Sequence, residues 1–109
     1  MNELVEQHRG AIRVLCQKYG VRRLDLFGSA TTGAFDPTRS DLDFVATFAD
    51  TNLPGYADRY LGFAEALEAL FNRSVDVITE RSIRSPYFRQ AVEASRQPIY
   101  DEPDASAAA

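Results

Sequence analysis

Two aspartates, two positions apart, could form the core of a cation site. Asp41 and Asp43 alternate with Leu42 and Phe44 in the stretch DLDF, and residues i and i+2 of a β-strand project to the same side. Two carboxylates held side by side repel, so such a pair is costly unless a cation compensates it. Hard divalent ions, Mg²⁺ above all, bind oxygen ligands of this kind. The pair therefore predicts a metal-binding strand face, and an ordinary solvent-exposed face is the plain alternative.

A third acid, Asp76, lies between Val75 and Val77 in the stretch SVDVITE. If this strand lies beside the strand of Asp41 and Asp43, the three carboxylates form a cluster that can hold two metal ions. Two metals suit in-line displacement at phosphorus, because one lowers the pKa of the attacking hydroxyl and the other stabilises the leaving oxygen. The acids therefore favour chemistry on a phosphate ester or anhydride.

A Gly-Ser pair, Gly28 and Ser29, follows the apolar stretch LDLF directly. Where a strand ends, free backbone N–H groups and a hydroxyl can bind phosphate oxygens, and a glycine permits close backbone approach. An isolated Gly-Ser pair most often marks a turn. Here the aspartates follow at a fitting distance, which supports phosphate binding. No G-x-x-x-x-G-K-[ST] stretch is present, so a P-loop is excluded at the level of the motif.

The spacing of apolar residues predicts the elements that position these groups. We expect helices over 3–19, about 56–71 and about 86–95, strands over 21–27, 41–48 and 74–80, and a short edge strand over 98–101. Loop 30–40 is too rich in turn residues to be a long regular element. Strands alternating with helices predict a sheet covered by helices.

Length and composition predict one small domain. The chain has 109 residues and a formal net charge of −4, which argues against nucleic-acid binding through a broad basic surface. We expect a folded domain over 1–100 and a disordered tail over 101–109. A lone cysteine, Cys16, indicates a reducing compartment, and a charged N-terminus with no long apolar run predicts a cytoplasmic protein without a membrane span.

The stretch FGSATTGAFDPTRSDLDF, with the later VDV, resembles the signature of the DNA polymerase β-like nucleotidyltransferase superfamily, specifically its minimal nucleotidyltransferases. The resemblance covers residues from about 3 to 100. It implies an α/β (α+β) fold, similar to the polymerase β palm, with a small mixed sheet flanked by helices. It also implies Mg²⁺-dependent transfer of a nucleotide from a nucleoside triphosphate, with loss of pyrophosphate.

The same resemblance implies a role for each matching residue. Gly28 and Ser29 would bind phosphate, and Asp41 and Asp43 would bind the metal ions. Asp76 would bind the acceptor-side metal and help to deprotonate the attacking hydroxyl. Many relatives place an arginine directly after the Gly-Ser pair. This chain has Ala30 there, so triphosphate binding is expected to depend on Arg39 or another cation.

Minimal family members often resemble antitoxins encoded beside a HEPN-domain ribonuclease, and some transfer AMP from ATP to a tyrosine of that toxin. The resemblance therefore implies ATP as donor, two Mg²⁺ ions, and a hetero-oligomer with a HEPN-domain toxin. The chain is too short for a separate acceptor-binding domain, which favours an acceptor supplied by a docking protein. The alternatives are a non-catalytic antitoxin that blocks its toxin stoichiometrically, and transfer to a small molecule such as an antibiotic. Nucleic-acid polymerisation is disfavoured by the acidic balance.

Overall fold

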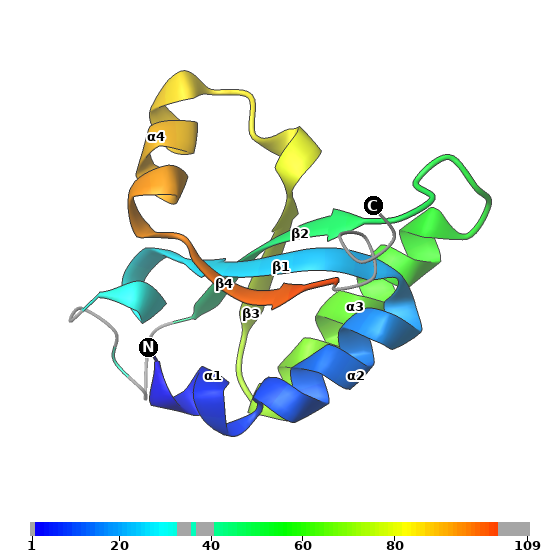
Figure 1. Cartoon of the computed structure of the whole chain (residues 1–109), viewed down its shortest axis with the longest axis horizontal. Coiled ribbons are helices and arrows are strands. Elements are labelled where there is room, and N and C mark those ends of the chain that lie inside the picture. Colours follow the sequence, from blue (N-terminus) through cyan, green and yellow to red (C-terminus); the bar gives the residue numbers. More distant parts are fainter. Residues whose placement is uncertain (1, 33–35, 37–40, 103–109) are drawn as a thin grey trace.

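A four-stranded mixed sheet organises the molecule (Figure 1). The computed structural model describes residues 2–32, 36 and 41–102. The strands are β1 (Val21–Phe27), β2 (Leu42–Phe48), β3 (Val75–Thr79) and β4 (Gln97–Asp101). Their order is β3-β2-β1-β4, with β1 antiparallel to β2 and β4, and β2 parallel to β3. The predicted α/β (α+β) class with a small mixed sheet is confirmed.

In the described ranges, four helices cover the two faces of this sheet unequally. They are α1 (Glu3–Gln7), α2 (Arg9–Tyr19), α3 (Tyr56–Phe71) and α4 (Pro86–Ser95), with short 3-10 turns η1 (Gly28–Thr31) and η2 (Glu80–Ser82). Figure 1 shows α1, α2 and α3 on one side of the sheet and α4 on the other. The larger core lies under the first three helices, where Leu24, Leu26 and Phe44 meet Ile12 and Phe63.

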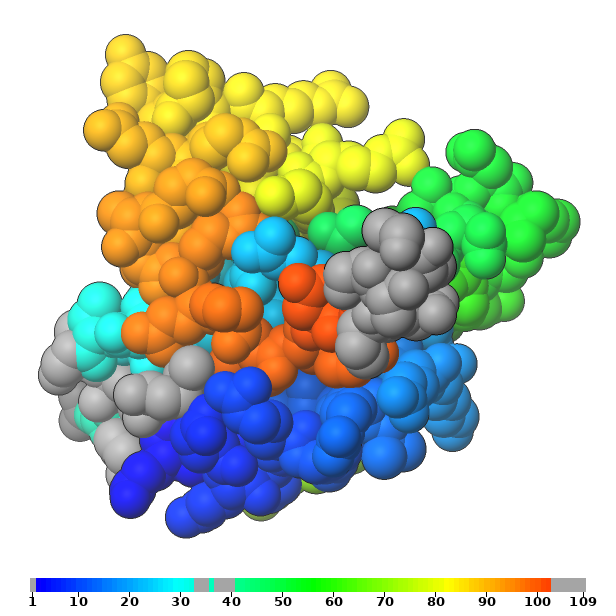
Figure 2. Space-filling model, in the orientation of Figure 1, coloured from blue at the N-terminus to red at the C-terminus, as the bar shows by residue number. Residues whose placement is uncertain are grey.

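A second, smaller core lies beneath α4. Phe27 and Val45 of the sheet contact Ile83 and Val92 there. Figure 2 shows the segment from η2 through α4, coloured yellow to orange, as a lobe that rises from the rest of the molecule. This core covers only part of the sheet face, and two of the predicted site residues, Asp43 and Asp76, lie on strands β2 and β3 there.

The first helix is not continuous. The predicted helix 3–19 is interrupted at His8, which has φ −109° and ψ 12° between α1 and α2. The His8 Nδ1 lies 2.9 Å from the Leu4 carbonyl oxygen, which the His8 backbone N–H would bond in a continuous helix. The side chain thus takes the place of the backbone donor, and the chain bends there.

The other elements begin and end within a residue or two of their predicted bounds, and β4 lies at the edge of the sheet as expected. Described structure continues past residue 100. Asp101 belongs to β4, and the Glu102 N–H donates to the Arg22 carbonyl at 2.8 Å. The remainder of the predicted tail, 103–109, lies outside the described residues. Within the part of the chain that is described, no helix is long and apolar enough to cross a membrane.

Candidate active site

Strand register brings the predicted acids together. Asp43 on β2 is the partner of Phe27 on β1 and of Asp76 on β3. Leu42 and Phe44 point into the larger core, so Asp43 between them points to the α4 face. Val75 and Val77 contact the same core, which places Asp76 on the α4 face as well. The adjacency of the two acidic strands, which the sequence could state only conditionally, is therefore real.

The pKa of Asp43 is raised by its burial and by two acidic neighbours. Burial raises the pKa of its carboxyl group, and the negative charges of Asp76 and then Asp41 raise that pKa further. Asp43 is half-buried, whereas Asp41, just before β2, and Asp76 are exposed. The arrangement concentrates negative charge on one small area of the sheet, as a site for a cation would require.

These acids supply the hard oxygen donors that Mg²⁺ prefers, so the donor set fits the ion that the sequence predicts. They do not form a preformed cage. Among residues 2–32, 36 and 41–102, no three His, Cys, Asp or Glu side chains converge closely enough to hold one ion. Strand register brings Asp43 and Asp76 together, and Asp41 precedes β2, but metal binding by the three carboxylates stays a prediction.

Gly28 packs directly against this acidic group. Its φ is +76°, in the left-handed region that favours glycine. A Cβ atom at this position would lie 2.8 Å from Asp43 Oδ2, too close for any real contact. Gly28 is thus required both by its backbone conformation and by the close approach of the carboxylate. The glycine and the aspartate, well separated along the chain, form one contact.

The backbone N–H of Gly28 is already in use. It donates to Ser95 Oγ at 3.0 Å, from the last residue of α4. The Gly28 N–H is therefore engaged within the protein, and phosphate binding by Gly28 and Ser29 stays a prediction. Ser29 is half-buried in η1, and its hydroxyl makes no hydrogen bond to the described residues. Arg39, expected to bind the triphosphate, lies outside the described residues.

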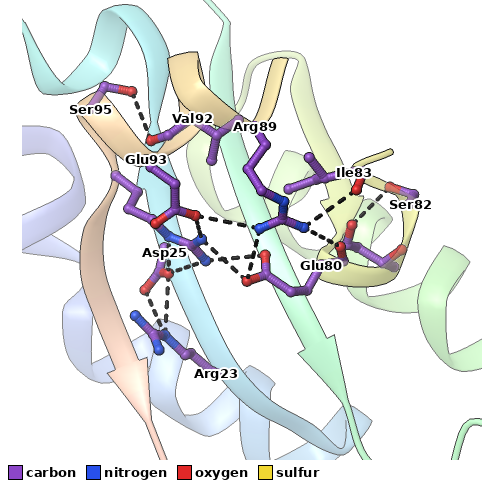
Figure 3. Close-up of polar contacts among 11 residues, drawn as sticks. Arg23, Asp25, Glu80, Ser82, Ile83, Arg89, Val92, Glu93 and Ser95 are labelled. Carbon is purple, nitrogen blue, oxygen red and sulfur yellow. Dashed lines mark hydrogen bonds and ion pairs between the residues drawn. The ribbon is translucent and has the colours of Figure 1, made fainter. Parts of the chain in front are cut away.

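Sequence reasoning missed one buried acid on the same face. Asp25 of β1 is completely buried. Figure 3 shows it between Arg23 and a group of charged side chains from η2 and α4. Arg96 Nη2 lies 2.6 Å from Asp25 Oδ2, and Arg23 Nε lies 3.2 Å from the same oxygen. The available signal was an acid between Leu24 and Leu26, the same pattern that singled out Asp43 and Asp76.

Arg96 joins this acid to the surrounding elements. Its guanidinium also contacts Glu80 at 3.2 Å and Glu93. Burial alone would lower the pKa of Arg96, but hydrogen bonds to Glu80, Asp25 and Glu93 outweigh it and raise the pKa overall. The side chains of the network pair with one another, so it anchors the C-terminal end of α4 on the sheet rather than offering a free ligand site.

A mixed sheet with acids on adjacent strands beside a Gly-Ser turn is typical of nucleotidyltransferases. Comparison with known proteins agrees. The nucleotidyltransferase domain family matches residues 8–99. A protein of Methanocaldococcus jannaschii, provisionally named a protein adenylyltransferase, is 33% identical over 93 residues, which are 85% of this chain and 88% of the relative. The chain belongs to the nucleotidyltransferase domain family, and its enzyme class is nucleotidyltransferase.

Solved structures share the fold. One described provisionally as a minimal nucleotidyltransferase superposes with a TM-score of 0.71 at 29% identity, covering 88% of this chain and 93% of that chain. Another is described as a tri-AMPylated HEPN toxin of Shewanella oneidensis in complex with MNT antitoxin, where MNT stands for minimal nucleotidyltransferase. It gives a TM-score of 0.62 at 19% identity, covering 94% of this chain and 76% of that chain. The predicted resemblance to minimal nucleotidyltransferases is confirmed.

Proposed function

We propose that this chain transfers AMP from ATP to a tyrosine hydroxyl of a HEPN-domain ribonuclease toxin and thereby acts as its antitoxin. The observation that carries the proposal is the register of Asp43 with Asp76 on one face, with Gly28 packed against the Asp43 carboxylate. This arrangement supplies acids for metal ions beside a turn that can receive phosphate. The adenylyltransferase name of the archaeal relative supports AMP as the transferred group, and the AMPylated toxin complex supports a HEPN protein as the acceptor.

Each residue has a role in this proposal. Asp41 and Asp43 hold divalent metal ions, and Asp76 binds the metal ion on the acceptor side. The turn of Gly28 and Ser29 binds phosphate. Arg39 remains a proposed triphosphate ligand. When bound, two Mg²⁺ ions supply charge neutralisation of the phosphates and a lowered pKa for the attacking hydroxyl.

The reaction is an in-line displacement at the α-phosphorus of ATP. The acceptor oxygen forms a bond to that phosphorus, and the bond from the phosphorus to the α,β-bridging oxygen breaks. Pyrophosphate leaves, and AMP stays on the acceptor oxygen as a phosphodiester. Asp76 accepts the proton of the attacking hydroxyl and passes it to solvent, where its exposed carboxylate can release it. No redox step or further reactant is needed.

Intact-protein mass spectrometry of the HEPN partner tests this proposal. The partner is co-expressed with the native chain, or incubated with it, ATP and Mg²⁺. We expect a nucleotide-sized mass gain on the partner. In the incubation, EDTA present from the start should prevent this gain, and excess Mg²⁺ should restore it. The Asp41→Asn, Asp43→Asn variant should give no gain.

A charge-matched control separates the site from general electrostatics. Glu65→Gln, Asp101→Asn removes the same two negative charges at exposed positions on α3 and β4, and it should leave transfer unchanged. If the native chain neutralises the toxin with no mass gain, and the Asp41→Asn, Asp43→Asn variant also neutralises it, the non-catalytic antitoxin replaces this proposal. Mass gain on an aminoglycoside but not on the protein would favour the small-molecule alternative.

A further inference from the structure

We infer that Ser95, at the C-terminal end of α4, is a positioning residue that holds Gly28 in place against Asp43. This inference rests on the proposed function, because it assigns a role in organising the nucleotidyl-transfer site. Ser95 lies 67 residues from Gly28 along the chain, and its hydroxyl is the only described group that receives the Gly28 N–H.

The Ser95 hydroxyl has both of its hydrogen-bonding functions used. Its oxygen accepts from the Gly28 N–H at 3.0 Å. Its proton points back into α4, where the Ala91 and Val92 carbonyl oxygens lie 3.3 and 3.5 Å away, and Figure 3 shows the second of these contacts. The hydroxyl therefore acts as a bridge between the last turn of α4 and the turn after β1.

The hydrogen bond from Ser95 sets the position of a close contact between Gly28 and Asp43. Gly28 lies so close to Asp43 that an added Cβ would be 2.8 Å from Oδ2. A shift of the Gly28 backbone therefore changes the space available to the Asp43 carboxylate, or admits water beside it. The same backbone carries Ser29, so one hydrogen bond constrains both the acidic group and the expected phosphate ligand.

The far side of the bridge is rigidly held. Arg96 follows Ser95 directly and is ion-paired to the completely buried Asp25 at 2.6 Å. Val92, one turn earlier, is buried in the small core with Phe27. Ser95 is thus fixed between two anchored residues, which allows its hydroxyl to impose a position on Gly28 rather than follow it.

The test compares two serines at the two ends of the same helix. Ser95→Ala removes the bond to Gly28, whereas Ser85→Ala removes an equivalent bond, from the Phe88 N–H to Ser85 Oγ at 3.3 Å, at the other end of α4. Both variants lose one hydroxyl and the hydrogen bond that it accepts. Ser95→Thr keeps the hydroxyl. Each is assayed for AMP transfer to the HEPN partner and for hydrogen exchange of the Gly28 amide by NMR.

We expect Ser95→Ala to speed exchange of the Gly28 amide about fivefold, as the loss of one net hydrogen bond implies. The rate of AMP transfer at saturating ATP should fall about tenfold, with a much smaller change in KM for ATP, because misplacement acts mainly on the reacting geometry. Ser95→Thr should restore most of the rate. Ser85→Ala should leave both the Gly28 exchange and the transfer rate near those of the native chain.

The inference is overturned if Ser95→Ala transfers AMP at the native rate, or if Ser85→Ala loses as much activity as Ser95→Ala. The second result would mean that only the stability of α4 matters. Failure of the proposed function looks different, because then the native chain itself transfers no AMP. In that case the positioning role of Ser95 in transfer falls with it, while the exchange measurement still reports whether the hydroxyl holds Gly28.

Discussion

The ionised carboxylate of Asp43 is needed for the proposed chemistry but lowers the stability of the fold. Its carboxylate is half-buried, faces Asp76 across the strand pair, and packs against Gly28. Burial and two negative neighbours raise its pKa, so the folded chain binds this proton more tightly than the unfolded chain does. Ionisation at neutral pH is therefore a cost to the fold, which the proposed function explains as the requirement of a metal ligand.

Replacing this carboxylate should separate the two effects. Asp43→Asn should reduce AMP transfer by about 100-fold or more, since even removing an outer partner of a metal ligand typically costs about 10 to 100-fold. In metal-free buffer at pH 7 the same variant should melt at a higher temperature than the native chain.

The pH dependence gives the check. A carboxyl group whose pKa is raised by folding contributes to the free energy of unfolding. This contribution is fully present below the usual pKa of about 3.9 and is lost as the pH rises through the raised pKa. The difference in melting temperature between Asp43→Asn and the native chain should therefore shrink as the pH falls into the range where Asp43 becomes protonated. Thermal denaturation in EDTA across this range measures it. An Asn variant that is less stable at pH 7 would contradict the electrostatic account.

Gly28 should not tolerate a side chain. Gly28→Ala places a Cβ against Asp43 Oδ2 at a residue with φ +76°, and the left-handed conformation alone costs about 1–2 kcal/mol for a non-glycine residue. We expect at least that loss in the free energy of unfolding, measured in urea, together with a loss of AMP transfer. Gly10→Ala is the control, because it lies in α2 with nothing within 4 Å of the added Cβ, and it should stabilise by about 0.5 kcal/mol.

At the scale of elements, the attachment of α4 is the least ordinary feature of the fold. The core beneath this helix is small, and a buried ion pair does much of the anchoring. A buried pair contributes little compared with apolar packing, but breaking it leaves an uncompensated charge. The helix is therefore held by a group whose loss is costly, and its end carries the hydroxyl that contacts Gly28.

Arg96→Ala should destabilise strongly. It leaves the completely buried Asp25 with only the half-exposed Arg23, and we expect a loss of about 3–5 kcal/mol. Arg22→Ala breaks a pair with Glu102 whose side chains are 52% and 32% exposed, and it should cost less than about 1 kcal/mol. Urea denaturation of both variants measures the difference. Equal losses would mean that burial of Asp25 is not what makes the pair important.

At the scale of the whole molecule, the larger core closes completely around one thiol. Cys16 is fully buried on α2, facing the sheet beneath α1, α2 and α3. Burial raises its pKa from 9.0 to about 12. The folded chain therefore favours the thiol, and this contribution to stability is present below pH 9.0 and lost as pH rises towards about 12.

Labelling of Cys16 should report opening of the whole core. In native buffer near neutral pH, a thiol reagent should react with Cys16 far more slowly than with an exposed thiol, and urea should accelerate the reaction in step with unfolding. Gln17→Cys in a Cys16→Ala background puts a thiol at the next, exposed position of the same helix and should react at once. Rapid labelling of the native chain would contradict a closed core.

Local sequence was sufficient for most elements. The alternation in LDLF and DLDF and the helical spacing in 56–71 and 86–95 predicted β1, β2, α3 and α4 nearly to the residue. The helix over 3–19 was wrong in one respect, because the imidazole of His8 replaces a backbone donor and interrupts it. Apolar periodicity cannot detect that, since it does not register where a side-chain hydrogen bond goes.

The sequence by itself determined the acids, the Gly-Ser turn and the faces on which they lie, because side-chain direction along a strand follows from its period of two. Only the tertiary structure decided that Asp43 is the partner of Asp76, since strand order and register depend on long-range pairing. It also decided that Gly28 packs on Asp43 and is held by Ser95, and that Asp25 is paired with Arg96. These contacts join residues far apart along the chain, and no local preference specifies them.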